Sequence, residues 1–73
     1  MMPKNSILIS SPPDRELLVA EIFQQNEQWA ELNQEQEKLT VEIYPNQHEK
    51  AWVFEFDELI AILTEAKQRL VGR

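Results

Sequence analysis

The sequence predicts an α+β fold in which an antiparallel β-meander of four strands, or five, packs on one C-terminal α-helix. Two observations predict it. Residues 57–70 carry apolar side chains at helical spacing, and several segments before them alternate apolar and polar residues, as strands with one buried face do. Because a chain of 73 residues fits one small domain, we expect a single domain over residues 1–73, with residues 1–5 flexible.

The C-terminal segment, residues 57–70, predicts an amphipathic helix. Its apolar face is formed by Leu59, Ile62, Leu63, Ala66 and Leu70. Asp57 can cap the first turn, since a carboxylate accepts hydrogen bonds from unpaired backbone N–H groups there. Lys67 and Arg69 suit the negative end of the helix dipole, and Gly72 marks the expected end.

Three segments predict strands outside the ambiguous middle of the chain. Residues 38–44 and 51–56 alternate and are rich in β-branched or aromatic residues, and the polar residues 45–50 between them favour a turn. We therefore expect a hairpin that leads into the helix. Residues 7–10 are candidates for a fifth strand.

Residues 16–36 allow two structures. Ser11 as N-cap and Pro12 at the first helical position favour one helix over residues 12–36, which would make the fold α-β-β-α. The other structure has two strands, residues 16–23 and 28–33, joined by a turn around Asn26.

Register arithmetic favours the two strands. If Phe23 faces Trp29, a tight turn at residues 36–37 produces a consistent set of neighbours across the sheet. The expected pairs are Glu21 with Glu31, Glu35 with Lys38, Asn33 with Thr40, Glu31 with Glu42, Trp29 with Tyr44, and Glu42 with Glu55. One face is then uniformly apolar, as the buried face of an antiparallel sheet is: Leu18, Ala20, Ile22, Ala30, Leu32, Leu39, Val41, Ile43, Phe54 and Phe56.

The opposite face of this sheet supplies the candidate interaction surface. It combines a row of glutamates with a group of aromatic side chains: Glu21, Phe23, Trp29, Glu31, Glu42, Tyr44 and Glu55. Like charges on neighbouring strands repel, so the row has no evident folding benefit. The row can contact a basic partner or a second copy of the chain, can be a solvated face, or can hold a divalent cation weakly.

A set of hydrophobic-pattern motifs carries a resemblance. The motifs are Leu18-Val19-Ala20-Glu21-Ile22-Phe23, Trp29-Ala30-Glu31-Leu32, Val41-Glu42-Ile43-Tyr44-Pro45, Trp52-Val53-Phe54 and the helix with Ala66-Lys67. Over residues 17–70 the chain resembles a group of short uncharacterised bacterial proteins in which a β-meander precedes one C-terminal helix. That group usually has Gly at the first hairpin turn, where this chain has residues 24–27 as Gln-Gln-Asn-Glu. The resemblance implies the fold and no catalytic residue.

Composition narrows the function classes. The chain has a net charge of −6, no cysteine, one histidine and one glycine. An acidic balance opposes nucleic acid and anionic membranes, and one glycine excludes a glycine-rich phosphate loop. The apolar runs are far shorter than the roughly 20 residues of a membrane helix, so we expect a cytoplasmic protein.

These observations predict a protein that is not an enzyme and binds no cofactor or metal. The first hypothesis is a small protein-interaction module that self-associates, as a homodimer, through the aromatic sheet face or an edge strand. The second is an acidic immunity or antitoxin-like inhibitor, whose glutamate row would occupy the phosphate site of a basic partner. Six of the thirteen acidic residues lie between Glu16 and Glu37, where no basic residue occurs, which places the net charge in that segment.

Overall fold

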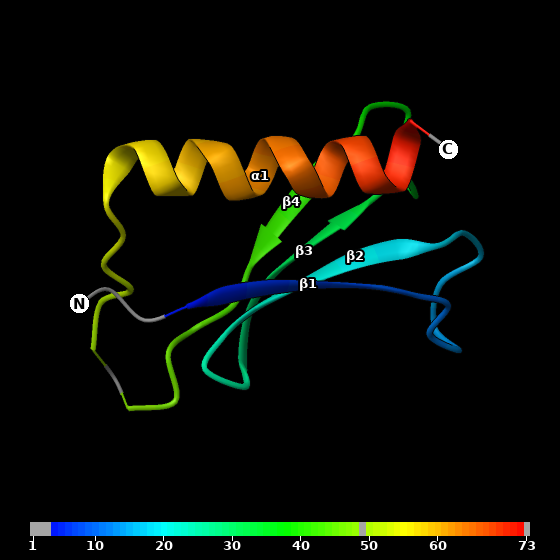
Figure 1. Cartoon of the computed structure of the whole chain (residues 1–73). Coiled ribbons are helices and arrows are strands. Elements are labelled where there is room, and N and C mark those ends of the chain that lie inside the picture. The colour runs from blue at the N-terminus through cyan, green and yellow to red at the C-terminus, as the bar shows by residue number, and fades with distance from the viewer. Residues whose placement is uncertain (1–3, 49, 73) are drawn as a thin grey trace.

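The fold is an open four-stranded antiparallel sheet followed by one helix (Figure 1). The computed structural model describes residues 4–48 and 50–72. The elements are β1 (Asn5–Ser10), β2 (Val19–Gln24), β3 (Glu27–Asn33), β4 (Thr40–Ile43) and α1 (Phe56–Val71). Strand order in the sheet is β1-β2-β3-β4, so each strand pairs with its neighbour in the chain. The predicted α+β meander is confirmed, and the alternative helix over residues 12–36 is wrong.

The identity of one strand differs from the prediction. The segment expected as an extra strand, residues 7–10, lies within β1, whereas residues 51–56 form no strand. Their alternation is real, because Trp52 and Phe54 pack against the core while Val53 is exposed. The segment passes the end of the sheet and rises to the start of α1 (Figure 1), so its side chains are buried without strand pairing. The expected pairing of Glu42 with Glu55 is therefore wrong.

The N-terminal residues were expected to be flexible over residues 1–5. Residues 1–3 lie outside the described residues. Asn5 opens β1 opposite Gln24, and its side-chain oxygen accepts a hydrogen bond of 3.0 Å from Nε1 of Trp29. The side chain of Asn5 is thus bonded to a core residue, and the flexibility expected for residues 1–5 stays a prediction.

Register matches the prediction at the centre of the sheet and departs from it at Trp29. Glu31 pairs with Glu21 on one side and with Glu42 on the other, as predicted. Between β2 and β3, however, Ile22 pairs with Ala30 while Phe23 pairs with Gln28, which leaves Trp29 as the extra residue of a β-bulge. The expected pairing of Phe23 with Trp29 is wrong. A bulge re-aims the side chain of the extra residue, and Trp29 packs in the core with the helix-side residues.

The hairpin between β2 and β3 turns on two residues in the left-handed region. Gln25 has a φ of 50° and Asn26 a φ of 71°. Two successive positive φ angles are the requirement of a two-residue type I′ turn, which matches the twist of the paired strands. The turn thus forms without the glycine that usually occupies such positions.

The core lies between the sheet and α1, which contacts β1, β2 and β3. Its buried members are Ala20, Ile22, Trp29, Ala30, Leu32, Ala66 and Leu70. Trp29 forms an aromatic cluster with the connection to the helix, since its ring centroid lies 4.3 Å from that of Phe54 and 6.5 Å from that of Trp52. These contacts join the sheet to the segment that precedes α1.

The predicted apolar face is only partly buried. Ala20, Ile22, Ala30 and Leu32 are buried, and Leu39 and Phe54 pack against the core. Four members are exposed instead: Leu18, Val41, Ile43 and Phe56. Val41 and Ile43 lie on β4, which α1 does not contact, and Phe56 begins the helix rather than ending a strand.

The predicted helix differs from α1 by one residue at each end. Its N-cap is Glu55, whose carboxylate accepts hydrogen bonds from the backbone N–H groups of Asp57 and Glu58. Asp57 therefore sits in the first turn and does not cap the helix. At the other end Gly72 is the C-cap, as predicted, and its N–H donates to the carbonyl of Gln68.

Candidate interaction surface

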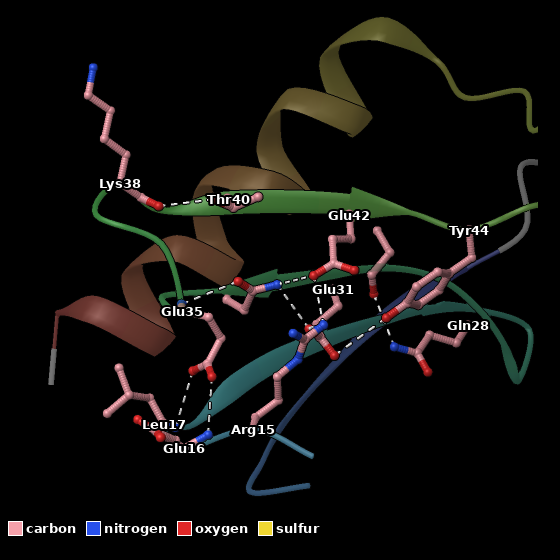
Figure 2. A network of polar contacts seen from close by, with 12 residues as sticks. Arg15, Glu16, Leu17, Gln28, Glu31, Glu35, Lys38, Thr40, Glu42 and Tyr44 are labelled. Carbon is pink, nitrogen blue, oxygen red and sulfur yellow. Dashed lines mark hydrogen bonds and ion pairs between the residues drawn. The ribbon is translucent and has the colours of Figure 1, made fainter.

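The face of the sheet opposite α1 is crossed by the loop between β1 and β2. The backbone N–H of Arg15 donates to the carbonyl of Pro12 over 3.1 Å, which closes a turn whose proline at the second position favours it. Further along, the carboxylate of Glu35 accepts hydrogen bonds from the backbone N–H groups of Glu16 and Leu17. These contacts hold the loop over β3 and β4 and place the side chain of Arg15 on the glutamate row (Figure 2).

Arg15 is the counter-ion of two glutamates in that row. Its Nη2 lies 2.9 Å from Oε2 of Glu31 and 2.7 Å from Oε2 of Glu42. Glu31 is 5% exposed, so its carboxylate has little water around it. The like-charge repulsion expected between these paired glutamates is thus balanced by a cation from the same chain.

Neutral donors complete the environment of Glu31. The side-chain amide of Asn33 donates to Oε2 of Glu31 over 3.0 Å and also to Glu42. The hydroxyl of Tyr44 donates to Oε1 of Glu31 over 3.4 Å. The buried carboxylate therefore has an ion pair and two further partners, as buried charges require. Figure 2 shows these side chains converging from β3, β4 and the β1–β2 loop.

The charges shift two pKa values in this network. Burial lowers the pKa of Arg15, but the neighbouring carboxylates of Glu31, Glu42 and Asp14 outweigh burial, and the pKa of Arg15 is raised. Burial raises the pKa of Tyr44 most, and the negative charges of Glu31 and Glu42 raise it further, while Arg15 opposes them. The neighbouring carboxylates outweigh burial for Arg15, whereas for Tyr44 they add to the larger effect of burial.

The structure brings together only part of the predicted surface. Glu31, Glu42 and Tyr44 form the network just described, and Glu21 lies beside Glu31 in the sheet. Phe23 is half-buried at the end of β2. Trp29 is in the core because of the bulge, and Glu55 caps α1, so neither belongs to this surface.

Arg15 and Asn33 were missing from the predicted surface. A signal was available, because Arg15 is the single basic residue between Lys4 and Lys38, and six unaccompanied acidic residues follow it. Asn33 carried no comparable signal, since its role depends on the register that places it between Glu31 and Glu42.

A second surface lies on the β4 side of the sheet. Exposed apolar residues lie on β4 and, apart from them, at the start of α1. We call the two on β4, Val41 (41% exposed) and Ile43 (67%), the β4-side strip; Phe56 (71%) and Ile60 (49%) are exposed on the helix, which does not contact β4. Phe56 and Ile60 are four residues apart, so they share one flank of the helix.

The described residues carry no sign of a metal centre or a bilayer crossing. Within residues 4–48 and 50–72, no three or more histidine, aspartate or glutamate side chains are placed to hold a metal ion. The helical part of these residues is neither long enough nor apolar enough to cross a membrane.

The fold and these surfaces define a small α+β domain with an open antiparallel sheet that one helix covers on one face. Comparisons with protein-family models, curated proteins and solved structures find no match to this chain. The predicted resemblance to short bacterial proteins with a β-meander and a C-terminal helix stays a prediction, and the functional argument depends on the chain's own surfaces.

Proposed function

We propose that this chain is a non-catalytic protein-interaction module that associates with a second copy of itself through the β4 side. The observation that carries the proposal is the β4-side strip, in which two large apolar side chains of an edge strand, Val41 and Ile43, are exposed on the same face of the sheet. Exposed apolar groups of this kind mark contact sites, and the interfaces of homodimers are the most apolar of protein surfaces.

The two edges of the sheet differ in a way that supports this choice. At β1, Ile7 and Ile9 pack against the core beneath α1. At β4, Val41 and Ile43 point to the same side of the sheet but lie beyond the contacts of the helix. The edge strand that α1 does not contact, β4, therefore exposes apolar side chains on the helix-facing side of the sheet. A second copy would remove these side chains from water without changing the fold of either chain.

The glutamate row supports an interaction function less than the sequence suggested. Arg15 and Asn33 already occupy the positions from which a basic partner would bind Glu31. The acidic-inhibitor hypothesis depended on a free row of carboxylates, and Glu31 is buried. The β4-side strip is thus the surface with unmet contacts.

Sedimentation equilibrium of the full chain and of the variant Ile43→Lys tests the proposal. We expect the parent to form dimers as concentration rises and Ile43→Lys to remain monomeric, because a charge at an exposed edge position cannot be buried. Leu8→Lys is the matched control, since Leu8 is 52% exposed on the other edge strand. A parent that stays monomeric to millimolar concentration, or a dimer that Ile43→Lys leaves intact, would contradict the proposal.

A further inference from the structure

The unpaired backbone groups of β4 belong to its apolar residues. The backbone N–H of Tyr44 donates to the carbonyl of Trp29 over 2.8 Å, which sets the phase of the β3–β4 ladder. In an antiparallel ladder alternate residues hydrogen-bond to the neighbouring strand, so Glu42 and Thr40 bond toward β3. The N–H and C=O groups of Val41 and Ile43 therefore point away from β3, toward the open edge.

We propose that two copies join β4 to β4 in antiparallel fashion, with the twofold axis at Val41, to form a continuous eight-stranded sheet. This inference rests on the proposed function and specifies its geometry. Val41 faces Val41 of the second copy, and Leu39 faces Ile43 of the second copy. The groups that bond across the interface are then those that β3 leaves free.

Electrostatics and proline exclude two alternative registers. An axis at Glu42 would place two Glu42 side chains directly opposite each other, which is unfavourable. An axis at Ile43 would place Val41 against Pro45, which has no backbone N–H to donate. With the axis at Val41, each Glu42 faces Thr40 of the second copy, and neither difficulty arises.

Charge complementarity is present in the register about Val41. Lys38 is exposed and extends beyond the β4 edge (Figure 2), and among the described residues its ammonium group forms no ion pair. The Glu42 side chain is 41% exposed. Antiparallel pairing about Val41 places Lys38 of one copy diagonal to Glu42 of the other, within reach of a long side chain. The twofold axis makes this contact occur twice.

The helix-facing side of the joined sheet becomes apolar across the interface. Residues of the same parity share a face, so Leu39, Val41 and Ile43 from both copies form one row. The strip that a single chain exposes thereby becomes the centre of a larger core.

Two substitutions test the pairing by sedimentation equilibrium. Val41→Pro removes an N–H that faces the edge and leaves the ladder to β3 intact, so we expect a folded monomer by circular dichroism. Val41→Ala is its matched control, because it keeps the N–H and should retain a dimer. A dimer that survives Val41→Pro overturns the β4 pairing while leaving self-association itself standing. A parent chain that stays monomeric overturns both proposals.

The exposed lysine tests the register independently of any effect of proline on folding. We expect Lys38→Glu to raise the dimer dissociation constant by about tenfold, since two attractive contacts become repulsive. Lys4→Glu changes the net charge equally at the other edge of the sheet and should leave the constant unchanged. If Lys38→Glu and Lys4→Glu have the same effect, the register about Val41 is wrong.

Discussion

The guanidinium of Arg15 lies 2.9 Å from the carboxylate of Glu31. Arg15 belongs to the β1–β2 loop and Glu31 to β3, so the two residues are distant in the sequence. Together with its contact to Glu42, this ion pair offsets the repulsion between the neighbouring carboxylates of Glu31 and Glu42. It also ties the long β1–β2 loop to the centre of the sheet. Its removal is therefore a test of stability as much as of surface charge.

Replacement of Arg15 by Gln should lower the urea midpoint of unfolding, because it leaves the buried Glu31 without its counter-ion. The double variant Arg15→Gln/Glu31→Gln should lose less stability than the sum of the two single variants, since it leaves no uncompensated charge there. Arg69→Gln is the matched control. Its 2.8 Å pair with Glu65 is half exposed, and its loss should change the free energy of unfolding by no more than about 0.5 kcal/mol. Strict additivity would show that Arg15 and Glu31 are independent.

Alkaline titration should show the raised pKa of Tyr44. Tyr44 is the single tyrosine of the chain, so absorbance of tyrosinate near 295 nm follows one group. Because the pKa of Tyr44 is raised above the ordinary tyrosine value of 10.0, the unfolded chain loses this proton first. The contribution of protonated Tyr44 to the free energy of unfolding is complete below pH 10. It is lost as pH rises from 10 through the pKa of Tyr44 in the folded chain.

Two variants test the cause of this shift in opposite directions. Arg15→Gln should raise the pKa of Tyr44 further, since Arg15 lowers it, whereas Glu31→Gln should reduce the shift. Movement of the two variants in the same direction would contradict the network as described.

Trp29 should be the most sensitive position of the core. It is buried, its Nε1 donates to Asn5, and its ring packs against Phe54. Trp29→Ala should cost about 3–5 kcal/mol, which approaches the whole stability of a domain this small. Trp29→Phe keeps much of the packing and loses the hydrogen bond. Urea unfolding followed by circular dichroism measures both, with the exposed Val53→Ala as control. A Trp29→Ala variant as stable as the control would place Trp29 outside the core.

Sequence periodicity predicted the helix and most of the strands, but it did not predict the β-bulge that one extra residue produces at Trp29. The helix, β2 to β4 and the pairing of Glu31 with Glu42 follow from alternation and turn spacing. One extra residue in β3 moved the side chain of Trp29 from the predicted outer face to the core, because side chains alternate with a period of two. The alternation at residues 51–56 reflects the packing of Trp52 and Phe54 against the core, and it does not show that these residues pair with another strand.

The candidate surface was less predictable than the fold. A pattern along one strand shows which side chains share a face, but it does not show which loop covers that face. The contact between Arg15 and the glutamates depends on a turn at residues 12–15 and on the hydrogen bonds that Glu35 makes with the loop. These are non-local features that one sequence does not specify.

The β2–β3 turn should be stabilised by Asn and Gly, the residues that type I′ turns prefer. Gln25 has a φ of 50° and Asn26 a φ of 71°. Positive φ angles are unfavourable for residues with a Cβ atom and are tolerated best by Gly and Asn. Gln25→Asn with Asn26→Gly should stabilise the chain by about 0.5–1 kcal/mol, because Asn-Gly suits a type I′ turn. Thermal unfolding measures this change. Gln24→Gly, in the adjoining strand, should destabilise it, and equal effects at both sites would contradict the assigned turn.

The match between strand order and chain order has a kinetic consequence. Each strand pairs with the next strand along the chain, so the sheet forms from contacts between sequence neighbours, and chains with such local contacts fold fast. Docking of α1 joins the most distant parts of the chain, since it brings the C-terminal helix against β1. The cluster of Trp29, Trp52 and Phe54 forms at this step, so indole fluorescence in a stopped-flow experiment should report the arrival of the helix, later than the far-ultraviolet signal of the sheet.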